Sequence, residues 1–578
     1  MKYMIKTLVS AVMVATFAVP VTVFAQNITK NTTEIADDLF VSITFHDVRD
    51  DVAREGDRDI YAISTKNLGR YFAWLKQEGW QTISLQDVWD ARQKKRKLPE
   101  KSVLLTFDDG AISSYTRVFP LLKQYKYFAA FAIPTSWING NTKDAYEAYG
   151  QNSLMSWEQM REMQRSGLVE FVSHSNNLHK GILGNPQQSM QPAAITRQFL
   201  PEYQRYESDQ AYHQRVIDDL QQSKKILDTE LGIDTRAIFW PYGAVTKESE
   251  ELAEKAGLPM SFSLGSMSTL ADSGQTYQRA LVMNNPTPEM LHAEMLDFLT
   301  FAKDIHKQRR SYIRFDLAEM VSPNNQVFDQ KLGQFLDQVS ALQTNTILLK
   351  AVADEDGDGK IDVAYFPNRQ LDMRQDLLNR TVWQARTRAG NRVYAELPIS
   401  LQTKQGLNFA DLTAELVKYN SSIEGVMINI GDELACAIQK QSWDEECTQK
   451  IKKVFDIKDQ AKQQAKYYTN ISNNYQTVLK ITLKDKHLDG LMAFMEYSLK
   501  NHDFLYIEFD PVQDSGIFKI LEKQLEKLNS VQKQYLIVSF TVNPNGKESD
   551  WKKYYIVVVR WIFLQYNFYF LIYTFWNF

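Results

Sequence analysis

Several residue types are scarce in this 578-residue chain, and each scarcity narrows the interpretation. Only 2 cysteines occur, Cys436 and Cys447, so one disulfide is the most that can form, and two buried free thiols are the alternative. The net charge of -4 points to no particular class of partner. The one basic run, residues 92–97, precedes a predicted strand, and we interpret it as a solvated loop and not as a nucleic-acid-binding patch. No glycine- or proline-rich stretch marks a linker.

Histidine is also scarce, with 8 in the chain, yet three histidines follow predicted strands in the N-terminal part. His174 and His179 follow the apolar run Leu168–Ser173, and His46 follows Val41–Phe45. A lone histidine there would be read as an unrelated polar loop residue. Two histidines on one loop, with acidic residues available from another strand, are typical of a metal site.

A pair of carboxylates supplies the acidic part of this pattern. The buried strand predicted at Val103–Phe107 ends in Asp108 and Asp109. Neighbouring side chains on extended backbone point in opposite directions, so one carboxylate can bind a metal while the other accepts a proton from the attacking water. This is the equipment of a metal-assisted hydrolase.

A fourth predicted strand, Ala237–Trp240, ends in the tight turn Pro241-Tyr242-Gly243, whose backbone N–H groups could face a developing oxyanion. Four strand ends therefore carry groups suited to one chemistry. In (β/α) barrels the catalytic groups lie at the C-terminal ends of the strands, so we expect an α/β fold with a distorted (β/α) barrel in this half of the chain.

These motifs resemble those of the polysaccharide deacetylase family, also called the NodB homology domain or carbohydrate esterase family 4. The family's Thr-Phe-Asp-Asp-Gly motif matches residues 106–110, and its two-histidine motif matches His174 and His179. The resemblance implies that Asp108 is the general base. It also implies that Asp109 and the two histidines bind a divalent metal, zinc by preference, with cobalt, nickel or iron as alternatives.

Ordinary members of the family carry the general acid in a Leu-His-Asp motif at their end, whereas Phe45-His46-Asp47 stands at the start here. This permuted order is similar to that of the poly-β-1,6-N-acetyl-D-glucosamine N-deacetylases, and it implies His46 as the acid and the Tyr242 N–H as an oxyanion donor. The family's Arg-x-Pro-Tyr motif is Phe239-Trp240-Pro241-Tyr242 here, so the arginine that usually braces the base is absent.

The resemblance implies removal of N-acetyl groups from poly-β-1,6-N-acetyl-D-glucosamine in the periplasm, in support of export of a biofilm exopolysaccharide. An outer-membrane polysaccharide exporter is a candidate partner. Two alternatives stay open: a chitin or peptidoglycan deacetylase, and a carbohydrate-binding export factor whose deacetylase site has decayed. The intact acidic and histidine motifs argue against decay.

The N-terminus has the pattern of an exported protein. Lys2 and Lys6 precede the apolar stretch Leu8–Phe24, and small residues stand at the usual cleavage positions, so residues 1–25 predict a secretory signal peptide. A short membrane anchor is the alternative, which Pro20 disfavours. No cysteine stands at the cleavage site, so we expect no lipid attachment.

The length predicts two large domains, since one barrel commonly uses about 250 residues. We expect the deacetylase domain at 40–305 and a (β/α)8-like barrel at 310–555, with the boundary near His306–Arg310. In the first domain, Ser156 and Gln159 predict a capping box, and Thr246–Ala256 a helix closed by a glycine.

Seven strands at barrel spacing are expected in the second domain. They lie near 312–315, 347–349, 393–395, 426–428, 478–481, 505–507 and 536–538, with helices such as 328–342 and 373–388 between them. This region resembles a glycoside hydrolase family 153 barrel, most clearly at residues 353–359 and 366–369.

Glycosidases need two suitably spaced carboxyl groups, or a substrate group in place of one. Relatives carry His-Asp-Asp after the fourth barrel strand, but here the strand continues as Asn429-Ile430-Gly431-Asp432-Glu433. Either Asp432 takes over as the catalytic acid, or the barrel only binds polymer, and we favour binding.

Residues 354–362 also imitate a calcium loop, which raises a third function class, a calcium-binding structural protein of the envelope. Position twelve of that loop is Tyr365, where an EF-hand needs a bidentate glutamate, so this class is disfavoured.

The last 23 residues, 556–578, match a transmembrane helix in length, but Arg560 and the many aromatic residues make it an untypical one. The eighth barrel strand is expected where this tail begins. We therefore interpret the tail as an out-of-frame product that leaves the barrel incomplete at its C-terminus, with a membrane anchor as the alternative.

Overall fold

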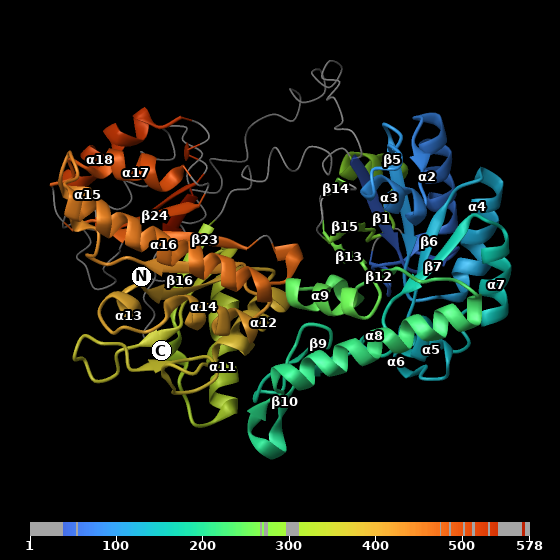
Figure 1. Ribbon diagram of the computed structural model, residues 1–578, viewed down its shortest axis with the longest axis horizontal. Coiled ribbons are helices and arrows are strands. Elements are labelled where there is room, and N and C mark those ends of the chain that lie inside the picture. Colours follow the sequence, from blue (N-terminus) through green and yellow to red (C-terminus); the bar gives the residue numbers. More distant parts are fainter. Residues whose placement is uncertain are drawn as a thin grey trace. The chain divides into compact units, whose positions relative to one another are not determined.

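The computed structural model describes residues 39–53, 56–265, 269–270, 276–295, 311–473, 475–484, 487–500, 503–510, 515–529, 532–533, 535–540 and 569–572. They form two compact units, coloured along the sequence in Figure 1. The first contains the described residues up to 295 together with 470–473, and the second contains the others from 311 onward. The predicted signal peptide and the predicted boundary at His306–Arg310 lie outside the described residues.

The first unit is built around a barrel. Its strands are β1 Leu39–Phe45, β2 Val48–Arg49, β3 Ile63–Ser64, β4 Gln81–Thr82, β5 Ser102–Phe107, β6 Ala129–Ile133, β7 Val169–Ser173, β8 Gly181–Leu183, β9 Met190–Pro192, β10 Phe199–Leu200, β11 Arg205–Tyr206, β12 Ala237–Phe239, β13 Met260–Leu264, β14 Thr269–Leu270 and β15 Tyr277–Leu281. Its helices and single turns are α2 Thr65–Gln77, α3 Leu85–Arg92, η2 Ser114–Val118, α4 Phe119–Tyr125, α5 Thr135–Ile138, α6 Lys143–Tyr149, α7 Trp157–Arg165, η3 Pro201–Tyr203, α8 Asp209–Leu231, η4 Pro241–Gly243, α9 Lys247–Lys255 and η6 Ile471–Asn473.

Seven of these strands close into a parallel barrel in chain order, β1-β5-β6-β7-β12-β13-β15. β1 closes it by pairing in parallel with β5 on one side and with β15 on the other. All their C-terminal ends therefore meet at one end of the barrel, which confirms the predicted α/β barrel and brings the predicted site motifs to the same place.

Burial of both strand faces explains the apolar runs in the sequence. Leu104, Ala130 and Val172 belong to one buried cluster, and their neighbours in sequence Leu105 and Phe131 belong to another. Because side chains alternate along a strand, these two clusters lie on opposite faces of the barrel wall.

Two predicted helix boundaries in this unit are confirmed. Ser156 and Gln159 form a reciprocal capping box at the start of α7. Thr246 caps α9, and Gly257 follows its end with φ of 87°, a conformation that glycine adopts without strain.

The second unit is also a barrel. Its strands are β16 Ser311–Asp316, β17 Thr346–Lys350, β18 Val352–Ala353, β19 Val363–Ala364, β20 Asp372–Met373, β21 Arg392–Pro398, β22 Gly425–Asn429, β23 Gln476–Thr482, β24 Phe504–Phe509, β25 Leu536–Phe540 and β26 Tyr569–Ile572. Its helices and single turns are η5 Leu317–Met320, α11 Asn325–Ala341, α12 Leu378–Ala389, α13 Ser400–Thr403, α14 Phe409–Lys418, α15 Ala435–Gln439, α16 Glu445–Tyr468, α17 Leu491–Leu499 and α18 Ser515–Lys527.

All seven predicted strands are present, in the barrel order β16-β17-β21-β22-β23-β24-β25. One helix begins later than predicted. α12 starts at Leu378 and not at Met373, because Met373 instead belongs to β20, where it is the partner of Ala364 on β19.

Closure of this barrel differs from the prediction of an incomplete one. β26, which lies inside the C-terminal tail, pairs in parallel with both β25 and β16 and is the eighth strand. A parallel barrel strand is buried on both faces, so the continuous apolar character of the tail suits this role as well as it suits a membrane helix. The other residues of 541–578 lie outside the described residues.

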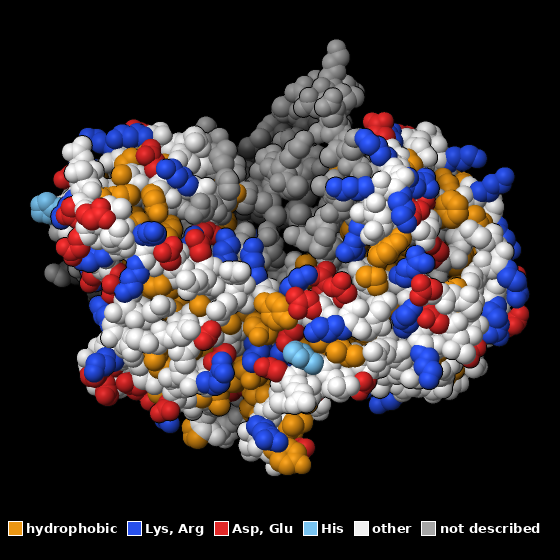
Figure 2. Space-filling view, viewed as in Figure 1, with side chains coloured by type: hydrophobic (Ala, Val, Ile, Leu, Met, Phe, Trp, Pro, Cys, Tyr) orange, Lys and Arg blue, Asp and Glu red, His pale blue; other side chains and the backbone are white. Residues whose placement is uncertain are grey.

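Cys436 and Cys447 form a disulfide that links α15 to α16, with 6.0 Å between their Cα atoms. This decides between the two alternatives left open by the sequence. None of the helices in the described ranges is long and apolar enough to cross a membrane. On the face seen in Figure 2, acidic and basic side chains are interspersed over each unit, in keeping with the small net charge.

Candidate active site

Asp109, His174 and His179 lie together at the C-terminal end of the first barrel. One potential ligand atom from each lies within 4.8 Å of the other two. The Nε2 atoms of His174 and His179 are 3.4 and 3.2 Å from Asp109 Oδ1. That oxygen is buried and has no hydrogen-bond partner among the residues that the structure describes. Two imidazole nitrogens converging on an orphaned carboxylate oxygen fit a divalent metal, which would satisfy all three.

The charges around this cluster also favour a cation. Burial lowers the pKa of His179, but the neighbouring Asp109 more than offsets this, and the pKa ends above its usual value. For Asp109 itself, burial raises the pKa, whereas the two histidines hold it well below its usual range. The carboxylate is therefore ionised and stabilises positive charge at this point.

The orientation of His174 is fixed from the next strand of the barrel. Its Nδ1 lies 2.6 Å from the carbonyl oxygen of Phe239, at the end of β12. A carbonyl accepts only, so Nδ1 carries the proton and Nε2 is left free as the ligand. One hydrogen bond therefore connects the two-histidine motif after β7 with the Phe239-Trp240-Pro241-Tyr242 motif after β12.

Two aromatic residues that the sequence analysis did not single out complete the surroundings. The Tyr149 hydroxyl, at the end of α6, donates to Asp109 Oδ2. Burial and the nearby Asp109 charge raise the pKa of Tyr149 well above its usual value, so it remains a donor. The buried Trp137 packs edge-on against His179, with 4.6 Å between ring centroids. No motif marks either residue, because both come from helices between the barrel strands.

The carboxylate of Asp108 binds Arg279 on β15. The guanidinium binds both carboxylate oxygens, at 2.7 and 3.0 Å, and the two side chains are 0% and 3% exposed. Burial raises the pKa of Asp108, but Arg279, His174 and His46 outweigh it and hold the pKa below its usual value. Asp108 is therefore an ionised carboxylate beside the metal cluster, as a general base requires.

Arg279 supplies the brace whose absence was inferred from the Arg-x-Pro-Tyr motif. It comes from a different strand, and its guanidinium also lies 4.3 Å from the centroid of the Phe239 ring. A second difference concerns the backbone. Asp109 and Gly110 have φ of 72° and 69°, so a left-handed turn, not an extended tip, directs the two carboxylates to different partners.

His46 lies beside Asp108 because β1 and β5 are in register, with Phe45 paired to Phe107. Its Nδ1 is buried without a hydrogen-bond partner among the described residues. The neighbouring Asp47 is held by Ser113 Oγ at 2.8 Å and Arg49 Nε at 3.0 Å. The ring of Tyr61, which is 40% exposed, lies 5.5 Å from the His46 ring.

Tyr242 lies at the rim of the same site. Its backbone is left-handed, with φ of 60°, and its ring lies 4.7 Å from that of His179 and is 52% exposed. The structure therefore brings six of the seven predicted site residues together around one point: Asp108, Asp109, His46, His174, His179 and Tyr242. The seventh, Asp432, lies elsewhere.

Asp432 belongs to the second unit, on an exposed turn after β22. A buried polar cluster that the sequence analysis missed lies within that barrel. Glu396 binds Arg314 at 2.5 Å, Asn429 at 2.9 Å and Lys480 at 3.4 Å, and Lys480 also binds Glu508 at 3.0 Å. Burial raises the pKa of Glu396, but the two cations bring it to about 2. Both carboxylates are paired with cations, and Glu396 is ionised, which is unlike a catalytic acid.

The acidic loop of the second unit brings together Asp354, Asp356 and Asp362. Asp354 already accepts hydrogen bonds from the N–H groups of Gly357 and Gly359, and Asp362 accepts that of Glu355. Tyr365, which stands at position twelve of the calcium-loop pattern, is fully buried. The loop is thus stabilised by its own backbone amides.

Comparisons with known proteins agree with this geometry. Residues 95–261 match the family model "Polysaccharide deacetylase", and residues 314–424 match "Hypothetical glycosyl hydrolase family 13". The poly-beta-1,6-N-acetyl-D-glucosamine N-deacetylase of Escherichia coli (strain K12) is 34% identical over 364 residues, which cover 62% of this chain and 53% of that protein. The first unit of the chain thus contains a segment, residues 95–261, that matches the polysaccharide deacetylase family. The chain spans about half the length of this Escherichia coli relative.

Solved structures of deacetylases are also similar to this chain in sequence. The BpsB deacetylase domain from Bordetella bronchiseptica is 39% identical, covering 43% of this chain and 97% of that chain, with a TM-score of 0.38. A de-N-acetylase from Aggregatibacter actinomycetemcomitans is 32% identical, covering 44% of this chain and 100% of that chain, with a TM-score of 0.41. The resemblance to the polysaccharide deacetylase family predicted from the motifs is confirmed.

Proposed function

We propose that this protein is a metal-dependent hydrolase that removes N-acetyl groups from poly-β-1,6-N-acetyl-D-glucosamine. The observation that carries the proposal is the orphaned, buried Oδ1 of Asp109 facing two histidine nitrogens, next to the separately held carboxylate of Asp108. A decayed site would have no need of this arrangement. The named activity of the Escherichia coli relative supports the choice of polymer over chitin or peptidoglycan.

Each residue then has one task in the hydrolysis of the amide. Zinc, with cobalt, nickel or iron as alternatives, would polarise the acetyl carbonyl and acidify the attacking water when held by Asp109, His174 and His179. Asp108 takes the proton of that water as its oxygen bonds to the carbonyl carbon. The Tyr242 N–H donates to the oxyanion, and His46 gives a proton to the amine as the carbon–nitrogen bond breaks and acetate leaves.

The proposed activity is tested by acetate release from β-1,6-linked N-acetylglucosamine oligomers, with β-1,4-linked chitin oligomers as the comparison. We expect release from the β-1,6-linked substrate, loss of activity after treatment with a chelator, and recovery on adding zinc or cobalt. Faster release from chitin oligomers would assign the protein to the other substrate class, and unchanged activity after verified metal removal would exclude the metal mechanism.

We further propose that the barrel of the second unit binds the polymer and does not cut it. The support is that Glu396 and Glu508 are paired with Arg314 and Lys480, while Asp432 lies on an exposed turn. The parent protein should therefore not shorten partly deacetylated polymer, and Asp432→Asn should leave acetate release unchanged. Chain shortening that disappears in Asp432→Asn, measured by gel filtration of the polymer, would instead make Asp432 a catalytic acid.

The place of action that we propose is the periplasm, during export of the polymer through an outer-membrane exporter. Its support is the signal-peptide pattern of residues 1–25 and the activity named for the relatives. Fractionation of cells that produce the tagged full chain tests it, with recovery in the periplasmic fraction as the expected result.

A further inference from the structure

The loop that carries both histidines is held by a carboxylate outside the metal cluster. Asp219 on α8 accepts a hydrogen bond from the Asn176 N–H through Oδ1 at 2.8 Å, and one from the Asn177 N–H through Oδ2 at 2.7 Å. These two amides lie midway between His174 and His179. The carboxylate therefore spans the backbone of the loop at its centre.

The other side of the loop is held by α5. The N–H groups of Thr135 and Ser136 donate to the carbonyl oxygens of Ser175 and Asn176, at 3.2 and 3.1 Å. The Thr135 hydroxyl donates to Asn176 Oδ1 at 2.9 Å. Asn176 is therefore hydrogen-bonded to α8 on one side and to α5 on the other, so the loop backbone is held between these two helices.

A second residue on the same face of α8, Ser223, contacts the strand end before the loop, one helical turn after Asp219. Ser223 Oγ lies 2.8 Å from Ser173 Oγ, which in turn accepts the N–H of Ser175 at 3.0 Å. Residues four apart on a helix project from the same face, so Asp219 and Ser223 contact consecutive parts of the segment that leads to the histidines.

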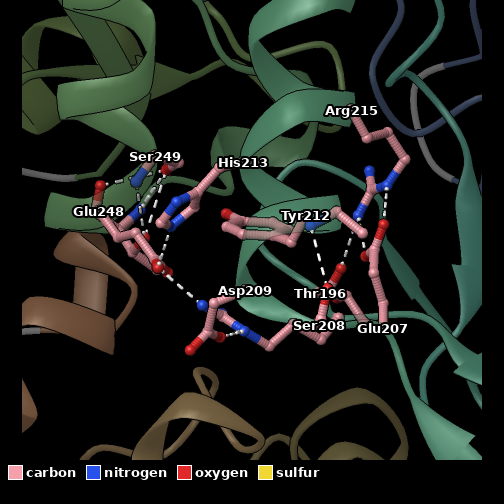
Figure 3. Close-up of polar contacts among 12 residues, drawn as sticks. Thr196, Glu207, Ser208, Asp209, Tyr212, His213, Arg215, Glu248 and Ser249 are labelled. Carbon is pink, nitrogen blue, oxygen red and sulfur yellow. Dashed lines mark hydrogen bonds and ion pairs between the residues drawn. The ribbon is translucent and has the colours of Figure 1, made fainter.

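α8 itself is fixed near its start by a largely buried polar network, shown in Figure 3. Arg215 binds Glu207 at 2.8 Å, and Glu248 on α9 binds His213 at 2.8 Å and Arg197 at 2.6 Å. The Tyr212 hydroxyl donates to the Ala194 carbonyl at 2.8 Å. Because the helix is continuous from this network to Asp219, the carboxylate has a fixed support.

We infer that Asp219 is a positioning residue for the metal site: its carboxylate fixes the backbone of residues 174–179 so that both histidines face Asp109. This inference rests on the proposed function, which supplies the metal, and it adds a group that touches neither metal nor substrate. Burial raises the pKa of Asp219 to about 6, although the two amides lower it. Burying a carboxylate costs desolvation free energy, and the two hydrogen bonds from the loop amides offset that cost.

The test is the affinity of the metal-free full chain for zinc, measured by competition with a chromophoric chelator. Asp219→Asn keeps the size of the side chain but replaces one acceptor oxygen with an N–H donor, so one loop amide loses its partner. We expect the dissociation constant for zinc to rise roughly 10- to 100-fold, as for other groups that orient metal ligands. Activity should return largely at saturating zinc.

The matched control is Asp218→Asn on the same helix. Asp218 is exposed and its carboxylate accepts a hydrogen bond from Gln214, so zinc affinity should be unchanged. Equal zinc affinity in Asp219→Asn and the parent, or a loss of thermal stability without a change in zinc affinity, overturns the inference. If the parent bound zinc but released no acetate, the proposed function would fail and the inference would stand. If the parent bound no metal, both would fail.

A measurement on the parent protein covers the case in which the variant does not fold. Hydrogen exchange at the Asn176 and Asn177 amides of the metal-free chain should be slow, because Asp219 holds both. Exchange as fast as in exposed loops would overturn the inference.

Discussion

Asp108→Asn should bind zinc like the parent and slow deacetylation by roughly 10²- to 10⁴-fold, whereas Asp109→Ala should lose both metal binding and activity. The two residues are adjacent, but their side chains have different partners: Arg279 for Asp108, and the two histidines for Asp109. The amide of Asp108→Asn cannot take a proton from water, yet it leaves the three potential ligands in place.

Zinc content after dialysis and the rate of acetate release are the two measurements. Asp144→Asn is a suitable control, since Asp144 is an exposed carboxylate on α6 near the same site, and both quantities should stay at the parent level. Full activity in Asp108→Asn would remove it as the base, and retained zinc in Asp109→Ala would move the metal to other ligands.

The site residues that can be predicted from the sequence are those that directly follow barrel strands. Asp108, Asp109, His174 and His179 each follow an apolar run that becomes a barrel strand, and parallel strands end on the same side of a barrel. Local pattern and the handedness of the fold therefore suffice to bring them together, without knowledge of any single contact.

Arg279 shows where such reasoning stops. It lies 171 residues from Asp108 along the chain, and the two meet because β15 pairs with β1, which in turn pairs with β5. A lone arginine in a strand gives no indication of which strand will be its neighbour. Tyr149 and Asp219 were missed for a related reason, since helices that connect strands can present almost any surface residue to the barrel end.

The eighth strand of the second barrel was missed for a different reason. The tail is apolar and aromatic throughout, and a buried parallel strand, a membrane helix and an unrelated apolar segment share that composition. Only the pairing of β26 with both β25 and β16 distinguishes the strand from the others.

Arg279→Met should destabilise the first unit by about 3–5 kcal/mol at neutral pH, the usual cost of leaving one member of a buried ion pair without the other. Both side chains are buried, and methionine fills similar space without charge. In the parent, burial raises the pKa of Asp108 but Arg279 and the histidines bring it below its usual value, so ionised Asp108 stabilises the fold above about pH 4 and this contribution is lost as pH falls. In the variant, burial dominates and protonation becomes favourable.

The difference in stability between Arg279→Met and the parent should therefore be greatest near neutral pH and shrink in acid, as Asp108 takes up a proton. Urea denaturation of the full chain at several pH values measures it. Adding Asp108→Asn to the variant should restore part of the lost stability at neutral pH, because the unpaired charge is gone. Arg236→Met is the control, since Arg236 pairs with the exposed Asp234 and such surface pairs contribute about 1 kcal/mol or less. A loss that is equal at all pH values, with no recovery in the double variant, would mean that Arg279 acts through packing on Phe239 and not through the charge of the base.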